Sequence, residues 1–169
     1  MGDSKDLPSL CAMAADEVYA ISRDCLMAHS IRAVEFYVSH KLQKPHHIIL
    51  MEDAQDFVLK KSWCAPGIPV SHTSRIWVDP SLPHDEKRFC IAHELYHIVL
   101  SVSPLDEALL EATAKECGVH PKVYIEHLSD KFARDLCNQH HGFYCDPKNI
   151  DNHCKFHNTN FQSLQGITL

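Results

Sequence analysis

The N-terminal part of the chain carries apolar residues at every third or fourth position, which is the spacing of one buried helix face. This spacing predicts a helix over about residues 7–29, on Leu10, Met13, Ala14, Val18, Ile21 and Cys25. A second helix is predicted over about residues 31–41, and Pro45 ends it. The first part of the chain is therefore expected to form two helices.

The middle of the chain has a different pattern, in which short apolar runs alternate with turn residues. Runs of this kind predict strands at residues 47–51, 57–59 and 75–79. The segment 64–69, with the sequence CAPGIP, is predicted to be a turn. Pro80 and Pro83 end the last strand.

Helical periodicity returns in the C-terminal half. Three helices are predicted over about residues 84–101, 106–117 and 121–139. Pro104 ends the first, Gly118 ends the second, and Pro121 fits the first turn of the third. From about residue 142 the chain is polar and aperiodic, which predicts an irregular tail. The order of helices, strands and helices favours an α+β fold in one domain spanning residues 1–169, with a small mixed or antiparallel sheet flanked by helices.

Composition narrows the classes of partner. Hydrophobic residues make up 45% of the chain and charged residues 22%, as in an ordinary globular protein. The formal net charge of -6 disfavours direct binding to nucleic acid or to anionic membranes. No apolar run is long enough to span a bilayer, and the opening MGDSKDLPSL lacks the pattern of a signal peptide. We therefore expect a cytoplasmic protein whose eight cysteines are reduced thiols.

The helix predicted over residues 84–101 contains the segment His93-Glu94-Leu95-Tyr96-His97. Two histidines four residues apart project from one helix face, so both imidazoles can bind one zinc ion, and Glu94 can take a proton from a water beside it. The alternative is an ordinary amphipathic helix with two surface histidines. The apolar residues around the segment argue against that alternative, because burying two unsatisfied imidazoles is costly.

A catalytic zinc usually has three protein ligands, so a third ligand is expected downstream. The candidate carboxylates are Glu107, Glu111, Glu116 and Glu126. Glu126 is favoured because Asp130 follows one turn later and can accept a hydrogen bond from a ligating histidine. Glu111 is disfavoured because 13 residues separate it from His97, which leaves little chain for a returning helix. A solvated pair of carboxylates on an exposed helix is the alternative to a site at Glu126 and Asp130.

Two segments together resemble the ImmA/IrrE family of zinc metallopeptidases. The first is RFCIAHELYH at residues 88–97, and the second, at residues 126–133, is similar to the family motif Glu-x-x-Ala-Asn-x-Phe-Ala. The resemblance covers about residues 75–136. Ser129 and Asp130 stand where the family has Ala and Asn, and residues 136–138 lack the apolar, proline-ended continuation of the family.

The resemblance implies a minimal zincin-like metallopeptidase fold, in which the HExxH helix and a C-terminal helix form the site. It implies that His93, His97 and Glu126 bind one zinc ion and that Glu94 is the catalytic base. It also implies a protein substrate, and known members cut a DNA-binding helix-turn-helix repressor. The expected function is therefore a zinc-dependent endopeptidase. The alternative is a zinc-containing binding module that regulates a transcription factor or toxin without cutting it.

Several roles stay open at the level of sequence. Candidates for stabilising the oxyanion are Tyr96, Tyr124, His140, His141 and Tyr144. A second zinc site is conceivable at Cys145, His153, Cys154 and His157, although a solvated tail with free thiols is favoured. Cys90 is expected to pack in the core rather than bind metal. Residues 75–77 are candidates for an edge strand that pairs with substrate, although a core position is favoured for Trp77.

Overall fold

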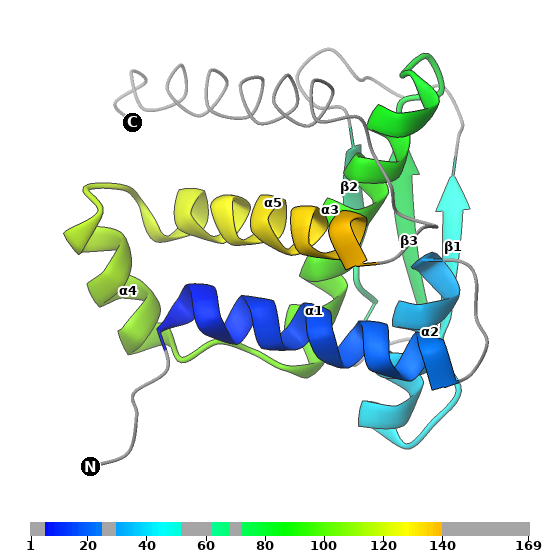
Figure 1. Cartoon of the computed structure of the whole chain (residues 1–169), viewed down its shortest axis with the longest axis horizontal. Coiled ribbons are helices and arrows are strands. Elements are labelled where there is room, and N and C mark those ends of the chain that lie inside the picture. The colour runs from blue at the N-terminus through cyan, green and yellow to red at the C-terminus, as the bar shows by residue number, and fades with distance from the viewer. Residues whose placement is uncertain (1–5, 25–29, 52–61, 68–71, 140–169) are drawn as a thin grey trace.

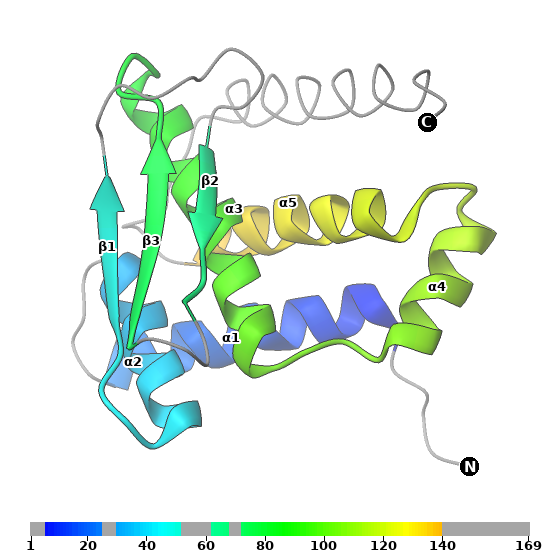
Figure 2. The same cartoon turned by 180° about the vertical axis from the view of Figure 1, so that it is seen from behind.

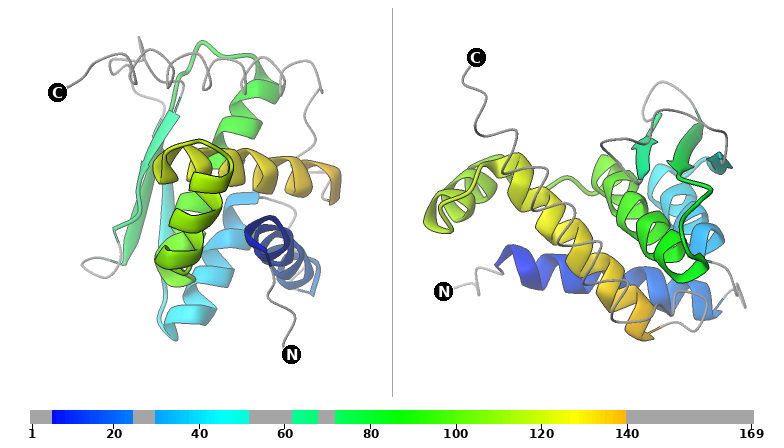
Figure 3. Two further views of the ribbon diagram at one scale, coloured as in Figure 1. Left: turned by 90° about the vertical axis from the view of Figure 1, so that its left-hand side faces the viewer. Right: turned by 90° about the horizontal axis from the view of Figure 1, so that it is seen from above.

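The computed structural model describes residues 6–24, 30–51, 62–67 and 72–139. In these residues the protein has an α+β fold with a three-stranded mixed sheet and five helices (Figure 1). The helices lie on one face of the sheet, as the view from behind and the side view both show (Figures 2 and 3). The predicted class, α+β with a small sheet and helices, is confirmed.

The sheet consists of β1 (His47–Met51), β2 (Ser62–Ala65) and β3 (Thr73–Val78), in the order β1-β3-β2. β1 runs parallel to β3, and β2 runs antiparallel to it. Side chains of β3 alternate, with Ser74, Ile76 and Val78 buried and Arg75 exposed. The buried side chains face the helices, so the register of β3 determines which residues reach the interior.

Two helices pack directly on the sheet. α2 (Ser30–Leu42) contacts β1, and α3 (His84–Val102) contacts β2 and β3. α3 buries nearly all of its middle turns, including Phe89, Leu95 and Ile98. Because α3 has neighbours on several sides, its polar residues His93 and Glu94 are enclosed by protein rather than by solvent.

A second layer of helices lies on the side of α2 and α3 away from the sheet, with α1 (Leu7–Asp24) against α2 and α5 (Pro121–Gln139) against α3. α1 and α5 also pack against each other (Figure 3). The ring of Tyr96 on α3 stacks on Phe132 of α5 at a centroid distance of 4.8 Å. Ala133 of α5 is fully buried, and its small side chain allows a close approach of helices.

α4 (Glu107–Glu116) precedes α5 in the chain. Local sequence signals determine where α4 begins and ends and where α5 begins. The carboxylate of Asp106 accepts a hydrogen bond from the backbone N–H of Leu109 and caps α4. Gly118 follows α4 with a φ of 69°, a left-handed conformation that glycine adopts without a steric penalty. α5 then begins at Pro121, as the sequence predicts.

The predicted helices agree closely with the structure, whereas the sheet departs from prediction at two points. Cys64 and Ala65, predicted as part of a turn, belong to β2. The strand is only four residues long and is followed directly by Pro66 and Gly67. A segment this short shows too little alternation of buried and exposed positions to predict a strand, and the turn residues beside it predict a turn. The segment 75–77, a candidate edge strand, lies instead in β3, which is central because β1 and β2 flank it.

The predicted strand at residues 57–59, the end of the first helix at residues 25–29 and the tail after residue 142 lie outside the described residues. Among the residues that the structure describes, no helix is long and apolar enough to cross a membrane.

Candidate metal centre

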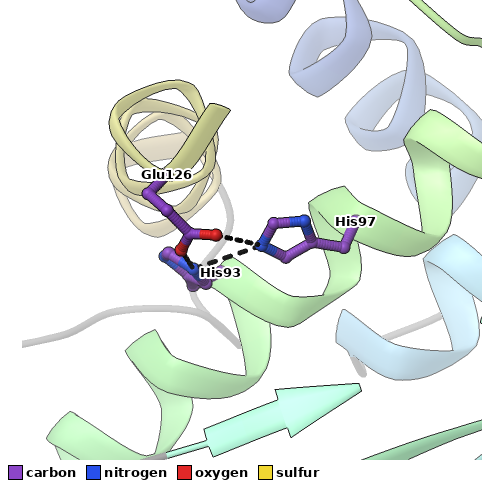
Figure 4. A group of neighbouring side chains, drawn as sticks. All are labelled: His93, His97 and Glu126. Atoms are coloured by element: carbon purple, nitrogen blue, oxygen red, sulfur yellow. Dashed lines mark hydrogen bonds and ion pairs between the residues drawn. The ribbon is translucent and has the colours of Figure 1, made fainter. Parts of the chain in front are cut away.

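Two histidines of α3 face a carboxylate of α5. His93 and His97 lie one turn apart on α3, and Glu126 reaches toward both imidazoles from α5 (Figure 4). The spacing of four residues places both rings on one helix face. The packing of α5 against α3 brings Glu126 to the same point from a segment far along the chain. The three side chains predicted to share a metal are therefore neighbours.

The nitrogen and oxygen atoms of this group converge. His93 Nε2 lies 2.9 Å from Glu126 Oε2 and 3.4 Å from His97 Nε2. His97 Nε2 lies 3.5 Å from Glu126 Oε1. Zinc binds such atoms at about 2.0–2.2 Å, so tetrahedral ligands lie roughly 3.3–3.6 Å apart. The three groups thus have the element types and nearly the separations of a zinc site with two histidines and a glutamate.

Asp130 lies behind the inner histidine. Its Oδ1 is 2.7 Å from Nδ1 of His93, and the ring N–H donates to this carboxylate. Asp130 is one turn after Glu126 on α5, so one face of that helix supplies both carboxylates. This bond fixes the orientation of the His93 ring and directs Nε2 toward Glu126 and His97, which is the role expected of Asp130 from the sequence.

The electrostatics of the group suit a bound cation. Burial alone would lower the pKa of His93, but hydrogen bonds to Asp130 and Glu126 and the nearby charge of Glu94 raise its pKa to about 10. Burial would raise the pKa of Glu126, but hydrogen bonds from His93 and His97 hold the pKa of this carboxyl far below its usual range. The carboxylates thus favour positive charge at the imidazoles, and a divalent metal ion can supply that charge in place of a proton.

The site has a buried end and an open end. The side chain of His93 is 1% exposed, whereas those of His97 and Glu126 are 23% and 22% exposed. A small molecule or a peptide group can therefore approach from the side of His97 and Glu126. The buried end excludes water, which strengthens the electrostatic interactions there.

Glu94 leaves α3 toward the sheet. It is 4% exposed, and its Oε1 accepts a hydrogen bond from the hydroxyl of Ser62 on β2 at 2.7 Å. Sequence reasoning missed Ser62 because it did not predict β2. The sequence around Ser62 offers only the short segment Ser62-Trp63-Cys64-Ala65, and this segment does not distinguish a strand from a turn.

Ser129 is a second residue that sequence reasoning did not place at the site. Its hydroxyl oxygen lies 3.3 Å from Nε2 of His97, and its O–H donates to the backbone carbonyl of Ile125. Ser129 is fully buried, so it fills the space between α5 and the ring of His97. Ser129 is three residues after Glu126 and one before Asp130, so the three side chains lie on one face of α5.

The remaining candidates lie elsewhere or outside the described residues. Glu107, Glu111 and Glu116 are exposed on α4 and do not join the group. Burial and the neighbouring Cys11 raise the pKa of Tyr96, whose ring is enclosed between α3 and α5. Cys90 is fully buried, as expected, and burial raises the pKa of Tyr124. The other candidates lie outside the described residues: His140, His141, Tyr144, Cys145, His153, Cys154 and His157.

Comparisons of the chain with models of protein families, with curated proteins and with solved structures gave no match. The chemistry of the site is therefore inferred from its own side chains.

Proposed function

We propose that this protein is a zinc-dependent endopeptidase that acts on a specific protein substrate. The convergence of His93, His97 and Glu126 on one point, with Glu94 next to His93 in the chain, is the observation that carries this proposal. Two imidazoles and one carboxylate leave one of four tetrahedral positions open, which is the composition of catalytic rather than structural zinc sites.

Each residue has a separate part in the proposed reaction. Zinc, when bound, polarises the scissile carbonyl and lowers the pKa of a water molecule at the site. His93, His97 and Glu126 hold the ion, and Asp130 orients His93. Glu94 accepts the proton of the attacking water and then donates it to the leaving amine, so that the peptide bond is hydrolysed without a covalent intermediate on the protein.

The proposed substrate is an extended polypeptide segment. β2 pairs with β3 along one side only, and on its other side the described residues supply no strand. A peptide that adds to this edge would lie beside Ser62, whose hydroxyl contacts Glu94. The resemblance to ImmA/IrrE metallopeptidases supports a zincin-like arrangement and suggests a helix-turn-helix repressor as the class of substrate.

A zinc-containing binding module that does not cut its partner is the second candidate function. It is favoured by one observation, which is that the Glu94 carboxylate is only 4% exposed and bonded to the sheet. A carboxylate enclosed in this way can stabilise the fold without taking part in hydrolysis. The two functions differ in what happens when Glu94 alone is changed.

The test uses the zinc-loaded chain, its Glu94→Gln variant, a peptide library made by digesting a proteome, and purified helix-turn-helix repressors. Cleavage sites are identified by mass spectrometry. We expect wild-type cleavage, and a loss of about 100-fold or more in Glu94→Gln with zinc content unchanged, because the general base is removed. Glu111→Gln is the matched control, since Glu111 is exposed on α4 and should retain full activity. Equal cleavage by Glu94→Gln would refute the mechanism, and zinc binding without any cleavage would favour the binding module.

A further inference from the structure

A hydrogen bond connects the sheet to Glu94, the residue next to His93 in the chain. The hydroxyl of Ser62 donates to Oε1 of Glu94 at 2.7 Å, and the two residues are 3% and 4% exposed. β2, which carries Ser62, packs against α3, which carries Glu94. A hydrogen bond to a buried carboxylate is short and strong, and loss of the donor leaves the carboxylate unsatisfied.

The direction of the Ser62 side chain is determined by its strand. Ser62 pairs with Val78 of β3, and Trp63 pairs with Trp77. Neighbouring residues of a strand point to opposite faces, and the rings of Trp63 and Trp77 stack at a centroid distance of 5.5 Å. The stacked pair stabilises this register on one face of the sheet, so Ser62 must point to the other face, toward α3.

The bond also determines how Glu94 presents its two oxygens. A glutamate side chain has three rotatable bonds, and several orientations of its carboxylate are open to it when nothing holds it. With Oε1 bonded to Ser62, the plane of the carboxylate is restrained and Oε2 is the oxygen left for another partner. Small errors in the placement of a reacting group lower rates strongly, so such a restraint has kinetic consequences.

We propose that Ser62 is a positioning residue for the base: its hydroxyl holds Oε1 of Glu94 so that Oε2 faces the water that attacks the peptide bond. This inference rests on the proposed peptidase function. It assigns the Ser62 hydroxyl no contact with metal or substrate, so the effect of the hydroxyl must pass through Glu94. Two properties follow: Ser62 acts on the chemical step rather than on metal binding, and its effect disappears when Glu94 is changed.

The first experiment compares Ser62→Ala and Ser62→Thr with the wild type on the best peptide found in the library screen. Ser62→Ala should lower kcat by about 10- to 100-fold, the size expected for a hydrogen bond to a charged group, while KM and zinc affinity stay unchanged. Ser62→Thr retains the hydroxyl and should recover most of kcat. A fall in kcat that threonine does not rescue would overturn the inference.

A matched control separates positioning from stability. Ser74 is a fully buried serine on the neighbouring strand β3, and its hydroxyl bonds His46 rather than the site. Ser74→Ala should lower the unfolding temperature in the way that Ser62→Ala does, but it should leave kcat unchanged. If Ser74→Ala lowers kcat as strongly as Ser62→Ala, the effect of Ser62 is structural and the inference fails.

The second experiment needs no substrate. Acetohydroxamate chelates zinc through its two oxygens and shares a proton with a neighbouring carboxylate, so its affinity reports the placement of Glu94. Its binding to the cobalt-substituted protein is followed by visible absorption. Ser62→Ala should weaken binding by about 10-fold, Ser62→Thr should not, and Ser62→Ala should have no further effect in Glu94→Gln.

The outcomes distinguish this inference from the proposed function. If the protein binds acetohydroxamate in a Ser62-dependent way but cuts no peptide, Ser62 does position Glu94, but the peptidase function fails and with it the role of Oε2 toward the attacking water. If the protein cuts peptides and Ser62→Ala changes neither kcat nor acetohydroxamate binding, the inference alone fails. If the wild type binds no metal, both fail.

Discussion

Two clusters in this protein combine histidines with carboxylates, and they are organised in opposite ways. The α3–α5 cluster consists of His93, His97, Glu126 and Asp130, and the α2–β1 cluster consists of Arg32, Glu35, His46, His47 and Ser74. In the first, one nitrogen of each imidazole and a carboxylate oxygen of Glu126 meet around one point, and Asp130 bonds the other nitrogen of His93. In the second, Glu35 and His46 bond separate partners that lie in different directions.

The partners of Glu35 show the difference. Its Oε1 accepts from the backbone N–H of Ile48 at 3.1 Å and lies 3.2 Å from Nδ1 of His47. Its Oε2 pairs with the guanidinium of Arg32. Burial raises the pKa of Glu35, but the hydrogen bonds from Arg32 and Ile48 outweigh it and lower that pKa. The charge of this carboxylate is thus neutralised by the protein itself, and the cluster joins α2 to β1.

The two buried histidines differ for the same reason. His46 is 1% exposed and bonds the hydroxyl of Ser74 at 2.7 Å, and burial lowers the pKa of His46. His93 is equally buried, but it faces two carboxylates and its pKa is raised to about 10. Burial alone therefore does not indicate a metal ligand. A metal ligand is indicated when an imidazole nitrogen is directed at both a carboxylate and a second imidazole, as that of His93 is.

The strongest expected difference between the clusters is in zinc affinity. Glu126→Ala removes one of three ligands, and since zinc sites with a full ligand set bind with about 10–16 kcal/mol, the loss should be roughly 1000-fold. Competition with a chromophoric chelator measures it. Glu35→Ala should leave the affinity unchanged. Retention of full affinity in Glu126→Ala would remove Glu126 from the ligand set.

The second expected effect is a loss of stability, and we expect it when the α2–β1 cluster is changed. Glu35→Ala leaves the buried N–H of Ile48 and the ring of His47 without their acceptor, so the free energy of unfolding should fall by about 3 kcal/mol. Urea denaturation in the presence of a chelator measures this loss. Glu35→Gln still offers an oxygen and should lose less. No loss in Glu35→Ala would contradict a structural role for the α2–β1 cluster.

The third expected effect separates a ligand from the residue that orients it. Asp130→Ala should weaken zinc binding by about 10- to 100-fold, and Asp130→Asn should weaken it less, because an amide oxygen can still accept from Nδ1 of His93. Asp135→Ala is the control on the same helix, since Asp135 pairs with Lys131. If asparagine is as harmful as alanine, the charge of Asp130 matters more than its hydrogen bond.

The expected effect that is smallest for a single pH unit is a pH dependence of the stability of the metal-free protein. The pKa of His93 is about 10 in the folded state and near 6.5 when unfolded, so its contribution is complete below pH 6.5 and is lost as the pH rises toward 10. Stability should fall by about 1 kcal/mol per pH unit in this range. Urea denaturation between pH 7 and 9 should show this slope in the wild type and not in His93→Gln.

The α2–β1 cluster is expected to respond with the opposite sign. The pKa of His46 is lowered by burial, so its contribution is complete above pH 6.5 and is lost as the pH falls below that value. His46→Gln should therefore leave the alkaline slope intact. Loss of the alkaline slope in His46→Gln would mean that the two clusters are not electrostatically separate.

Much of the helical structure could be predicted because its signals are local. The helix bearing His93 and His97 needs only a run of good helix formers between Pro83 and Pro104, and the spacing of four residues then fixes the relation of the two rings. α4 and α5 have a capping aspartate, Gly118 and Pro121 at their ends. Glu126 could be predicted as the third ligand, ahead of the carboxylates of α4, because Asp130 follows it on the same helix face.

The sheet was less predictable because strands are stabilised by partners far away in the chain. β2 has four residues, two of them in a segment with turn composition, and only its pairing with β3 makes it a strand. The central place of β3 likewise depends on which strands flank it. Ser62 could therefore not be connected to Glu94 from the sequence, because 32 positions separate two residues that one hydrogen bond joins.

The sequence by itself determined that His93 and His97 share a helix face, because the geometry of an α-helix relates any two residues four apart. It also determined which residues have the chemistry to bind zinc or move a proton. The tertiary structure decided that Glu126 and Asp130 reach His93, and that Ser62 reaches Glu94. Those contacts depend on the packing of α5 and β2 against α3, which is driven by burial of apolar side chains from distant parts of the chain.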